Sequence, residues 1–106
     1  MSILDLSVCK ERDIEIILPS GKHINVLRPN VGLVGYVNNY KSLVGKISNQ
    51  KELSELIVEM SNLIINNNRQ NYVLTPREAS KLDELDRLQI INSYMAFIER
   101  IATSPN

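Results

Sequence analysis

Apolar residues recur at helical spacing through most of the chain and at two-residue spacing near its start. The clearest helical pattern begins after Asn49 and runs to about Ile65. Its apolar residues stand at i, i+3, i+4, i+7, i+10 and i+11, which is one face of an α-helix. Asn49 can cap this helix through its side chain, and Glu52 stands at the third position of a capping box. The apolar face consists of Leu53, Leu56, Ile57, Met60, Leu63 and Ile64.

A β-hairpin is predicted over Asp13–Arg28. Residues that favour strands stand on both sides of Pro19-Ser20-Gly21, which is a turn signal. Because an isolated hairpin is marginally stable in water, it must pack on helices or pair with a third strand. Ile3–Val8 is the candidate third strand. Ile17 and Leu27 are out of phase with the alternation, which indicates a hairpin that is covered on both faces.

A weaker helical pattern follows the hairpin, from Val31 to Ile47. Asn30 can cap this helix directly after Pro29, which cannot continue a strand. Three glycines lie within it, and each lowers helix stability by up to about 1 kcal/mol relative to alanine. The apolar spacing still predicts a helix here.

The last third of the chain opens with a strong helix start. Thr75 can accept a hydrogen bond as the cap, and Pro76 occupies the first helical position, where no N–H is required. Glu78 can bond back to the N–H of the cap residue. A short helix is therefore predicted from Pro76 to about Glu84. An asparagine-rich break at positions 66–71 separates it from the preceding helix.

The longest predicted helix begins at Asp83 or Asp86 and runs to about Thr103. Two adjacent apolar stripes run along it, and together they are wider than one neighbouring element needs. The first stripe is Leu85, Leu88, Ile91, Met95, Ile98 and Ala102, and the second is Ile90, Tyr94, Phe97 and Ile101. The sequence thus predicts an α+β fold in one domain, with a β-rich part over residues 1–28. A part of about four helices follows over residues 30–104.

Composition and charge narrow the classes of function. Twelve basic residues balance twelve acidic ones, which argues against nucleic acid as a partner because phosphate neutralisation needs a basic excess. No apolar run approaches the length of a membrane span, and the first residues do not resemble a signal peptide. The single cysteine, Cys9, cannot form an internal disulfide, which fits a cytoplasmic location.

Candidate chemical groups are few. His23 is the only histidine, and a metal site would need several further ligands at workable spacing, so an exposed strand residue is expected there. Asp83, Glu84 and Asp86 could perform acid–base chemistry, but such a cluster more often caps a helix or faces water. Cys9 has no histidine near it in the sequence, so an inert thiol is expected. The sequence predicts no enzyme and no cofactor.

The order of elements and several short motifs resemble one protein family. A hairpin is followed by helices, the asparagine-rich break and Leu74-Thr75-Pro76-Arg77-Glu78, and then by the run Tyr94-Met95-Ala96-Phe97-Ile98. Over residues 13–106 this order resembles the small tail assembly chaperones of phages and prophages of Gram-positive hosts. The resemblance implies a non-enzymatic protein of the host cytoplasm. It would bind the helix-rich tape measure protein, cover its apolar surfaces and bring in tail tube subunits.

Apolar faces on two helices are the expected contact surfaces for such a partner, and a homo-oligomer is also expected. Core packing explains the same residues equally well. The alternative function is a small homo-oligomeric virion structural or completion protein. The candidate contact residues are Leu56, Met60, Leu63, Tyr94, Met95 and Ile98.

Overall fold

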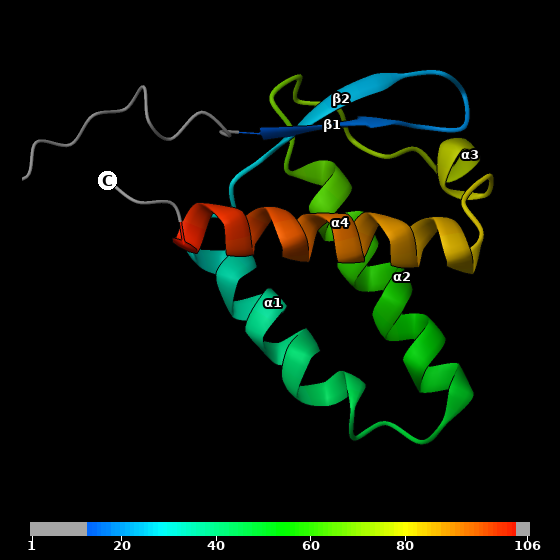
Figure 1. Cartoon of the computed structure of the whole chain (residues 1–106). Helices are drawn as coiled ribbons and strands as arrows, with labels where there is room; N and C mark the ends of the chain where they lie inside the picture. Colours follow the sequence, from blue (N-terminus) through cyan, green and yellow to red (C-terminus); the bar gives the residue numbers. More distant parts are fainter. Residues whose placement is uncertain (1–12, 104–106) are drawn as a thin grey trace, which may run out of the picture.

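A computed structural model of the chain describes residues 13–103. An N-terminal antiparallel hairpin is followed by four helices, so the predicted α+β class is confirmed (Figure 1). The predicted strand Ile3–Val8 and the cysteine Cys9 lie outside the described residues. The elements are β1 (Asp13–Ile17), β2 (His23–Leu27), α1 (Val31–Val44), α2 (Gln50–Asn66), α3 (Pro76–Ala79) and α4 (Glu84–Thr103).

The hairpin turns where the sequence predicts it. Gly21 adopts φ +92°, a left-handed conformation that glycine reaches without steric cost. Its N–H donates to the carbonyl oxygen of Leu18 at 2.7 Å. The register places Ile24 and Val26 on the side of the helices, where both are fully buried. Ile17 points to the opposite side and is 59% exposed, so the prediction that helices cover both faces is wrong at this residue.

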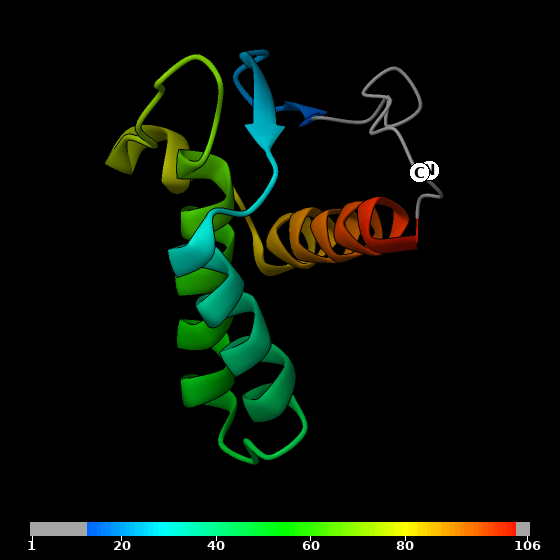
Figure 2. The ribbon, with the colours of Figure 1, turned by 90° about the vertical axis from the view of Figure 1, so that its left-hand side faces the viewer.

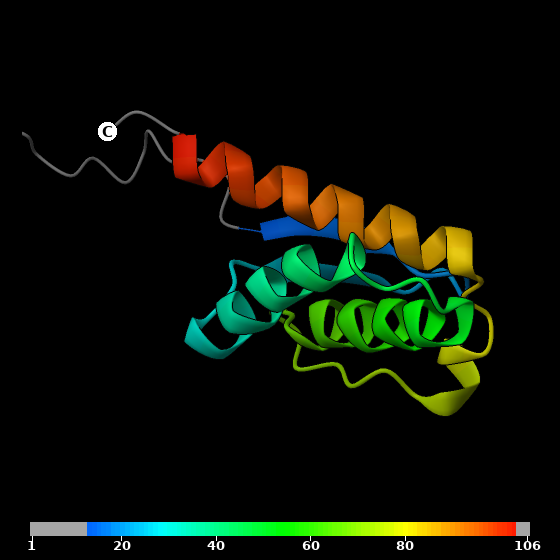
Figure 3. The same cartoon turned by 90° about the horizontal axis from the view of Figure 1, so that it is seen from below.

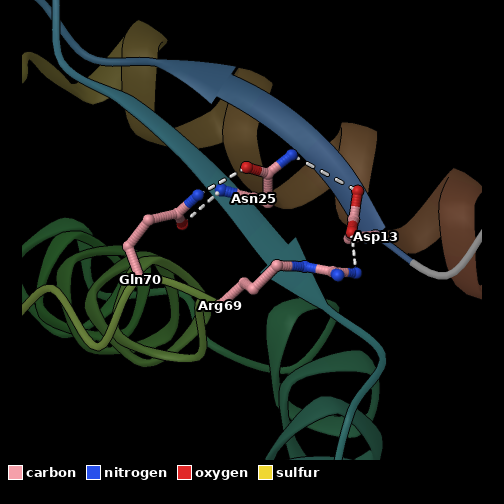
Figure 4. A network of polar contacts seen from close by, with 4 residues as sticks. All are labelled: Asp13, Asn25, Arg69 and Gln70. Carbon is pink, nitrogen blue, oxygen red and sulfur yellow. Dashed lines mark hydrogen bonds and ion pairs between the residues drawn. The ribbon is translucent and has the colours of Figure 1, made fainter.

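The loop after α2 closes the outer edge of β2. The N–H of Leu27 donates to the carbonyl oxygen of Asn67 at 2.9 Å. The N–H of Arg69 donates to the carbonyl oxygen of Asn25 at 2.8 Å. Side chains extend this contact, because Gln70 bonds to Asn25 and Arg69 pairs with Asp13 on β1 (Figure 4). The asparagine-rich break thus supplies β2 with a second backbone partner, on the edge opposite β1.

The core lies between the inner face of the hairpin and helices α2 and α4. In the described part of the chain α2 packs under β2 and α4 packs under β1, while α4 also crosses α2 (Figures 1 and 3). The rings of Tyr94 and Phe97 lie at its centre, fully buried, with their centroids 5.9 Å apart. Within residues 13–103, α1 packs against α2 and against no other helix or strand. This helix pair extends away from the hairpin (Figure 2).

Helix starts agree with the sequence better than helix ends. The side chains of Asn30, Asn49 and Thr75 each accept hydrogen bonds from the first turn of their helices, as predicted. Helix α1, however, ends at Val44 instead of Ile47, and Gly45 takes the capping position.

The start of the C-terminal third departs from the prediction in two ways. Helix α3 ends at Ala79 and does not reach Glu84, because Asp83 already caps α4 by accepting from the N–H of Asp86 at 2.7 Å. The carboxylate of Glu78 is buried and accepts from the N–H of Ser20 at 3.2 Å. Glu78 therefore fastens α3 to the hairpin turn, whereas the sequence predicted a bond back to its own cap.

Asn68 holds the loop that closes β2. Its side chain is buried and donates to the carbonyl oxygens of Ile65 at 2.8 Å and Tyr72 at 2.7 Å. It also accepts from the N–H of Tyr72 at 2.8 Å. We expect Asn68→Ala to lower the free energy of unfolding by about 2–3 kcal/mol, because these backbone groups would lose their partner. Urea denaturation followed by circular dichroism measures the loss.

Asn66→Ala, at the last residue of α2, is the matched control beside the same loop. Asn66 is exposed, and its side chain accepts a single hydrogen bond, from the N–H of Leu74. Its replacement should cost less than about 1 kcal/mol. Equal losses for the two variants would show that Asn68 does not hold the loop in this way.

Candidate protein-binding surface

Two of the six predicted contact residues belong to the core. Met60 is 2% exposed and Tyr94 is fully buried, so neither reaches the surface of the described fold. Both lie where α2 and α4 cross under the hairpin, and burial of their apolar atoms stabilises that crossing. Both side chains therefore pack inside the described fold, where a partner could not reach them without a change in the fold.

Tyr94 also serves as a hydrogen-bond donor inside the core. Its hydroxyl donates to the carbonyl oxygen of Leu27 at 2.8 Å, which ties α4 to the end of β2. Burial raises the pKa of Tyr94, and a hydrogen bond with the Asn67 side chain offsets part of this rise. The resulting pKa is about 12. The hydroxyl stays protonated at neutral pH, as a donor to a backbone carbonyl requires.

The raised pKa of Tyr94 predicts a loss of stability in alkaline solution. An unfolded tyrosine loses its proton near pH 10, whereas the folded one holds it to about pH 12. The unfolded state therefore binds fewer protons between these values, and the free energy of unfolding should fall as the pH rises from 10 to 12. Stability curves at several pH values measure this slope. Tyr94→Phe should flatten it, and equal slopes for both proteins would contradict the assignment.

Two other predicted contact residues, Leu56 and Leu63, lie half-buried on α2. Leu63 lines a small hollow of about 270 Å³ between α2 and α1, opposite Gly32 and Tyr36. Leu56 stands seven residues before Leu63, so helical spacing places it on the same side of α2. Both side chains therefore follow the line along which α1 and α2 meet.

Helix α1 contributes matching residues to this line. Gly32, Tyr36 and Leu43 are separated by four and seven residues, which places them on one side of the helix. Gly32 carries no side chain, Tyr36 is 48% exposed and Leu43 is half-buried. We call the surface formed by these three residues with Leu56 and Leu63 the α1–α2 seam.

The remaining predicted contact residues, Met95 and Ile98, lie on α4 and are half-buried against the core. Helices α1 and α4 do not pack together in the described part of the chain. Met95 and Ile98 do not line the hollow between α1 and α2, so they are not part of the α1–α2 seam. Tyr36 was missed in the sequence, although its place four residues after Gly32 and seven before Leu43 was a usable signal.

Exposed apolar side chains are concentrated on α1. Besides Tyr36, the exposed fractions are 92% for Val31, 42% for Val34 and 40% for Val44. A helix that packs on one neighbour and carries apolar residues on several other sides is typical of an interaction surface. Of these four side chains, Tyr36 also lies in the α1–α2 seam, which makes it the candidate contact residue on α1.

The side chains that could perform acid–base chemistry or bind a metal ion make contacts within the fold. His23 is exposed and its Nδ1 lies 3.4 Å from a carboxylate oxygen of Glu15 on the neighbouring strand. Asp83 and Asp86 bond to each other's backbone N–H at the start of α4. Within residues 13–103, no three histidine, cysteine or acidic side chains gather closely enough to hold a metal ion.

Arg87 is the buried charge that joins three helices. Its guanidinium donates to Ser61 Oγ and Asn62 Oδ1 at 2.7 Å each, and to the carbonyl oxygen of Ala79 at 3.4 Å. Burial lowers the pKa of Arg87. Its donors are directed at α2 and at the end of α3, so Arg87 fixes the start of α4 and does not face a ligand site.

Comparisons with known proteins identify no relative of this chain. The chain matches no family model, no curated protein and no solved structure. In the part of the chain that the structure describes, no helix has the length and apolar character needed to cross a lipid bilayer.

Proposed function

We propose that this chain is a protein-binding assembly factor of the tail assembly chaperone type. Amphipathic helices of a long tape measure protein would lie along the α1–α2 seam. The observation that carries the proposal is the line of partly exposed apolar residues where α1 meets α2, on a helix pair that extends from the body of the fold. The order of sequence elements that resembles this family supports the same conclusion.

The physical basis is the helix-in-groove mode of recognition. An amphipathic client helix in water exposes an apolar stripe, and the seam offers it apolar side chains on both flanks. Gly32 presents backbone with no side chain to the hollow, and Tyr36 supplies a large ring with few rotatable bonds. Burying the stripe keeps the client from associating with other copies of itself. Tube subunits would then release it by competing for the same stripe.

The polar groups of the core support a binding role. Buried Ser61, Asn68, Glu78 and Arg87 all hydrogen bond to other parts of the fold. Among residues 13–103, no buried side-chain nitrogen or oxygen lacks a partner. These groups therefore position the elements of the fold, and none of them is left free to hold a ligand inside the described core.

Co-expression with a tape measure protein encoded beside this chain tests the proposal. We expect the partner to remain soluble and to co-purify with this protein, whereas the partner alone should be insoluble. Size-exclusion chromatography with light scattering then gives the composition of the complex. A partner that stays insoluble and does not co-purify would contradict the chaperone function.

The same experiment distinguishes the chaperone function from the alternative function. A small virion structural or completion protein would assemble with itself, and light scattering of this protein alone would then give the mass of a closed ring. That result, together with no capture of the partner, would replace the chaperone proposal with the structural one.

A further inference from the structure

The α2 flank of the α1–α2 seam is acidic. Glu52 and Glu59 are exposed, whereas the seam residues Leu56 and Leu63 are half-buried. Along α2 the two glutamates alternate with the two leucines at spacings of four, three and four residues. Residues three and four apart are neighbours on the surface of a helix, so each leucine has a carboxylate beside it. Negative charge therefore borders the seam along α2.

The α1 flank of the seam is neutral. Gly32, Tyr36 and Leu43 form this flank, and none of them carries a charge. Lys41 is the single charged residue of α1. It lies five residues after Tyr36, which places it on another side of the helix. The acidic border along α2 is therefore not balanced by a basic border along α1.

Glu59 is the carboxylate that lies furthest from a basic residue of its own helix. Within residues 13–103, neither Glu52 nor Glu59 takes part in an ion pair. Lys51 is the single basic residue of α2, and it precedes Glu59 by eight residues, about 12 Å along the helix axis. This separation exceeds the Debye length of roughly 8 Å at physiological ionic strength. Salt therefore screens the two charges from each other, and a partner in the seam would meet the charge of Glu59.

We propose that the partner helix is basic along one border of its apolar stripe. Because this helix occupies the same seam, the inference rests on the proposed function. Glu52 and Glu59 are seven residues apart, about 10.5 Å along α2. A partner helix that runs along the seam has the same rise per residue. Two lysine or arginine residues seven positions apart would therefore face both carboxylates, while the apolar residues of the stripe enter the hollow beside Leu63.

The acidic border gives the seam a means of choosing among amphipathic helices. Apolar contacts alone attract any helix with an exposed apolar stripe. Complementary charges raise the rate of association, and like charges disfavour the wrong partner. A helix with glutamate or aspartate beside its stripe would place these side chains against Glu52 and Glu59, and the seam should bind it weakly.

Two synthetic helical peptides test this charge preference with the full chain. Both carry the same leucine stripe in an alanine-rich background. One has lysine at two positions seven residues apart beside the stripe, and the other has glutamate at the same positions. Fluorescence anisotropy measures the two dissociation constants. We expect the lysine peptide to bind at least about tenfold more tightly. The difference should shrink in about 1 M salt, where the Debye length is roughly 3 Å.

Glu59→Lys assigns the preference to the seam. We expect this change to weaken binding of the lysine peptide at least about fivefold and to strengthen binding of the glutamate peptide. The variant should fold well, because Glu55 then lies four residues before a lysine, which is a favourable pair on a helix surface. The control Glu15→Lys changes the net charge equally but lies on the hairpin, from which the helix pair extends away (Figure 2). It should leave both dissociation constants within about twofold.

The possible results separate this inference from the proposed function. Equal binding of the two peptides, or equal effects of the two variants, would overturn the basic border and leave binding through apolar contacts in place. If neither peptide binds, the inference is also wrong, and co-purification of the tape measure protein then decides the proposed function independently. A dimer of this chain that Tyr36→Asp separates in light scattering would place a second copy in the seam and would overturn the inference as well.

Discussion

Replacing Phe97 with alanine is expected to lower the free energy of unfolding by about 3–5 kcal/mol, because the change leaves a large cavity at the centre of the fold. Phe97 is fully buried beside the ring of Tyr94, where α4 packs under the hairpin. A loss of this size is a large share of the roughly 5–15 kcal/mol that keeps a domain folded. Urea denaturation followed by circular dichroism measures this loss. If the free energy of unfolding depends on urea concentration with the same slope in both proteins, the folded and unfolded states are unchanged in compactness.

Met95→Ala is the matched control on the same helix. Met95 is half-buried, so its truncation removes less buried area and should cost less than half of the Phe97 loss. The comparison tests which of the two apolar stripes of α4 faces the core. A larger loss for Met95 than for Phe97 would contradict the packing described above.

Tyr36→Asp is expected to weaken binding of the helical partner by at least about tenfold, because it places a charge in the middle of the α1–α2 seam. Tyr36 is 48% exposed, so the fold itself should lose little stability. Leu56→Asp should act in the same direction from the other flank of the seam. Surface plasmon resonance with an immobilised helical fragment of the partner measures the dissociation constants.

Val31→Asp is the matched control for charge and for loss of an apolar side chain. Val31 begins α1, is 92% exposed and falls outside the helical spacing of the seam. An acidic residue in the first turn also favours the helix dipole, so the variant should fold well. We expect binding within about twofold of the unchanged protein. Equal weakening by Val31→Asp and Tyr36→Asp would mean that the seam is not the contact surface.

Local features of the fold were predictable because short stretches of sequence determine them. Asn30, Asn49 and Thr75 were identified as caps from residue type and position, and each side chain accepts the expected bonds. The hairpin followed from alternation around Pro19-Ser20-Gly21. The role of Glu78 was not predictable, since its carboxylate accepts from Ser20, which is 58 residues away in the chain.

The division between core and surface could not be read from periodicity. Met60 and Leu63 belong to the same apolar face of one helix, yet Met60 is buried and Leu63 lines an open hollow. Which part of a stripe is covered depends on where the neighbouring helices cross, and that is set by the tertiary fold. For the same reason the sequence grouped Met95 with Leu63, although only Leu63 lines the hollow between α1 and α2.

Site-specific photo-crosslinking would locate the surface on which a helical partner binds, and we expect it to be the α1–α2 seam. A photoreactive phenylalanine analogue at position 36 replaces one half-exposed aromatic ring with another. The same analogue at Val73, which is 69% exposed in the loop between α2 and α3, is the control. In the co-purified complex we expect crosslinks to the tape measure protein from position 36 and not from position 73. Crosslinks from position 73 alone, or only between copies of this chain, would contradict the claim.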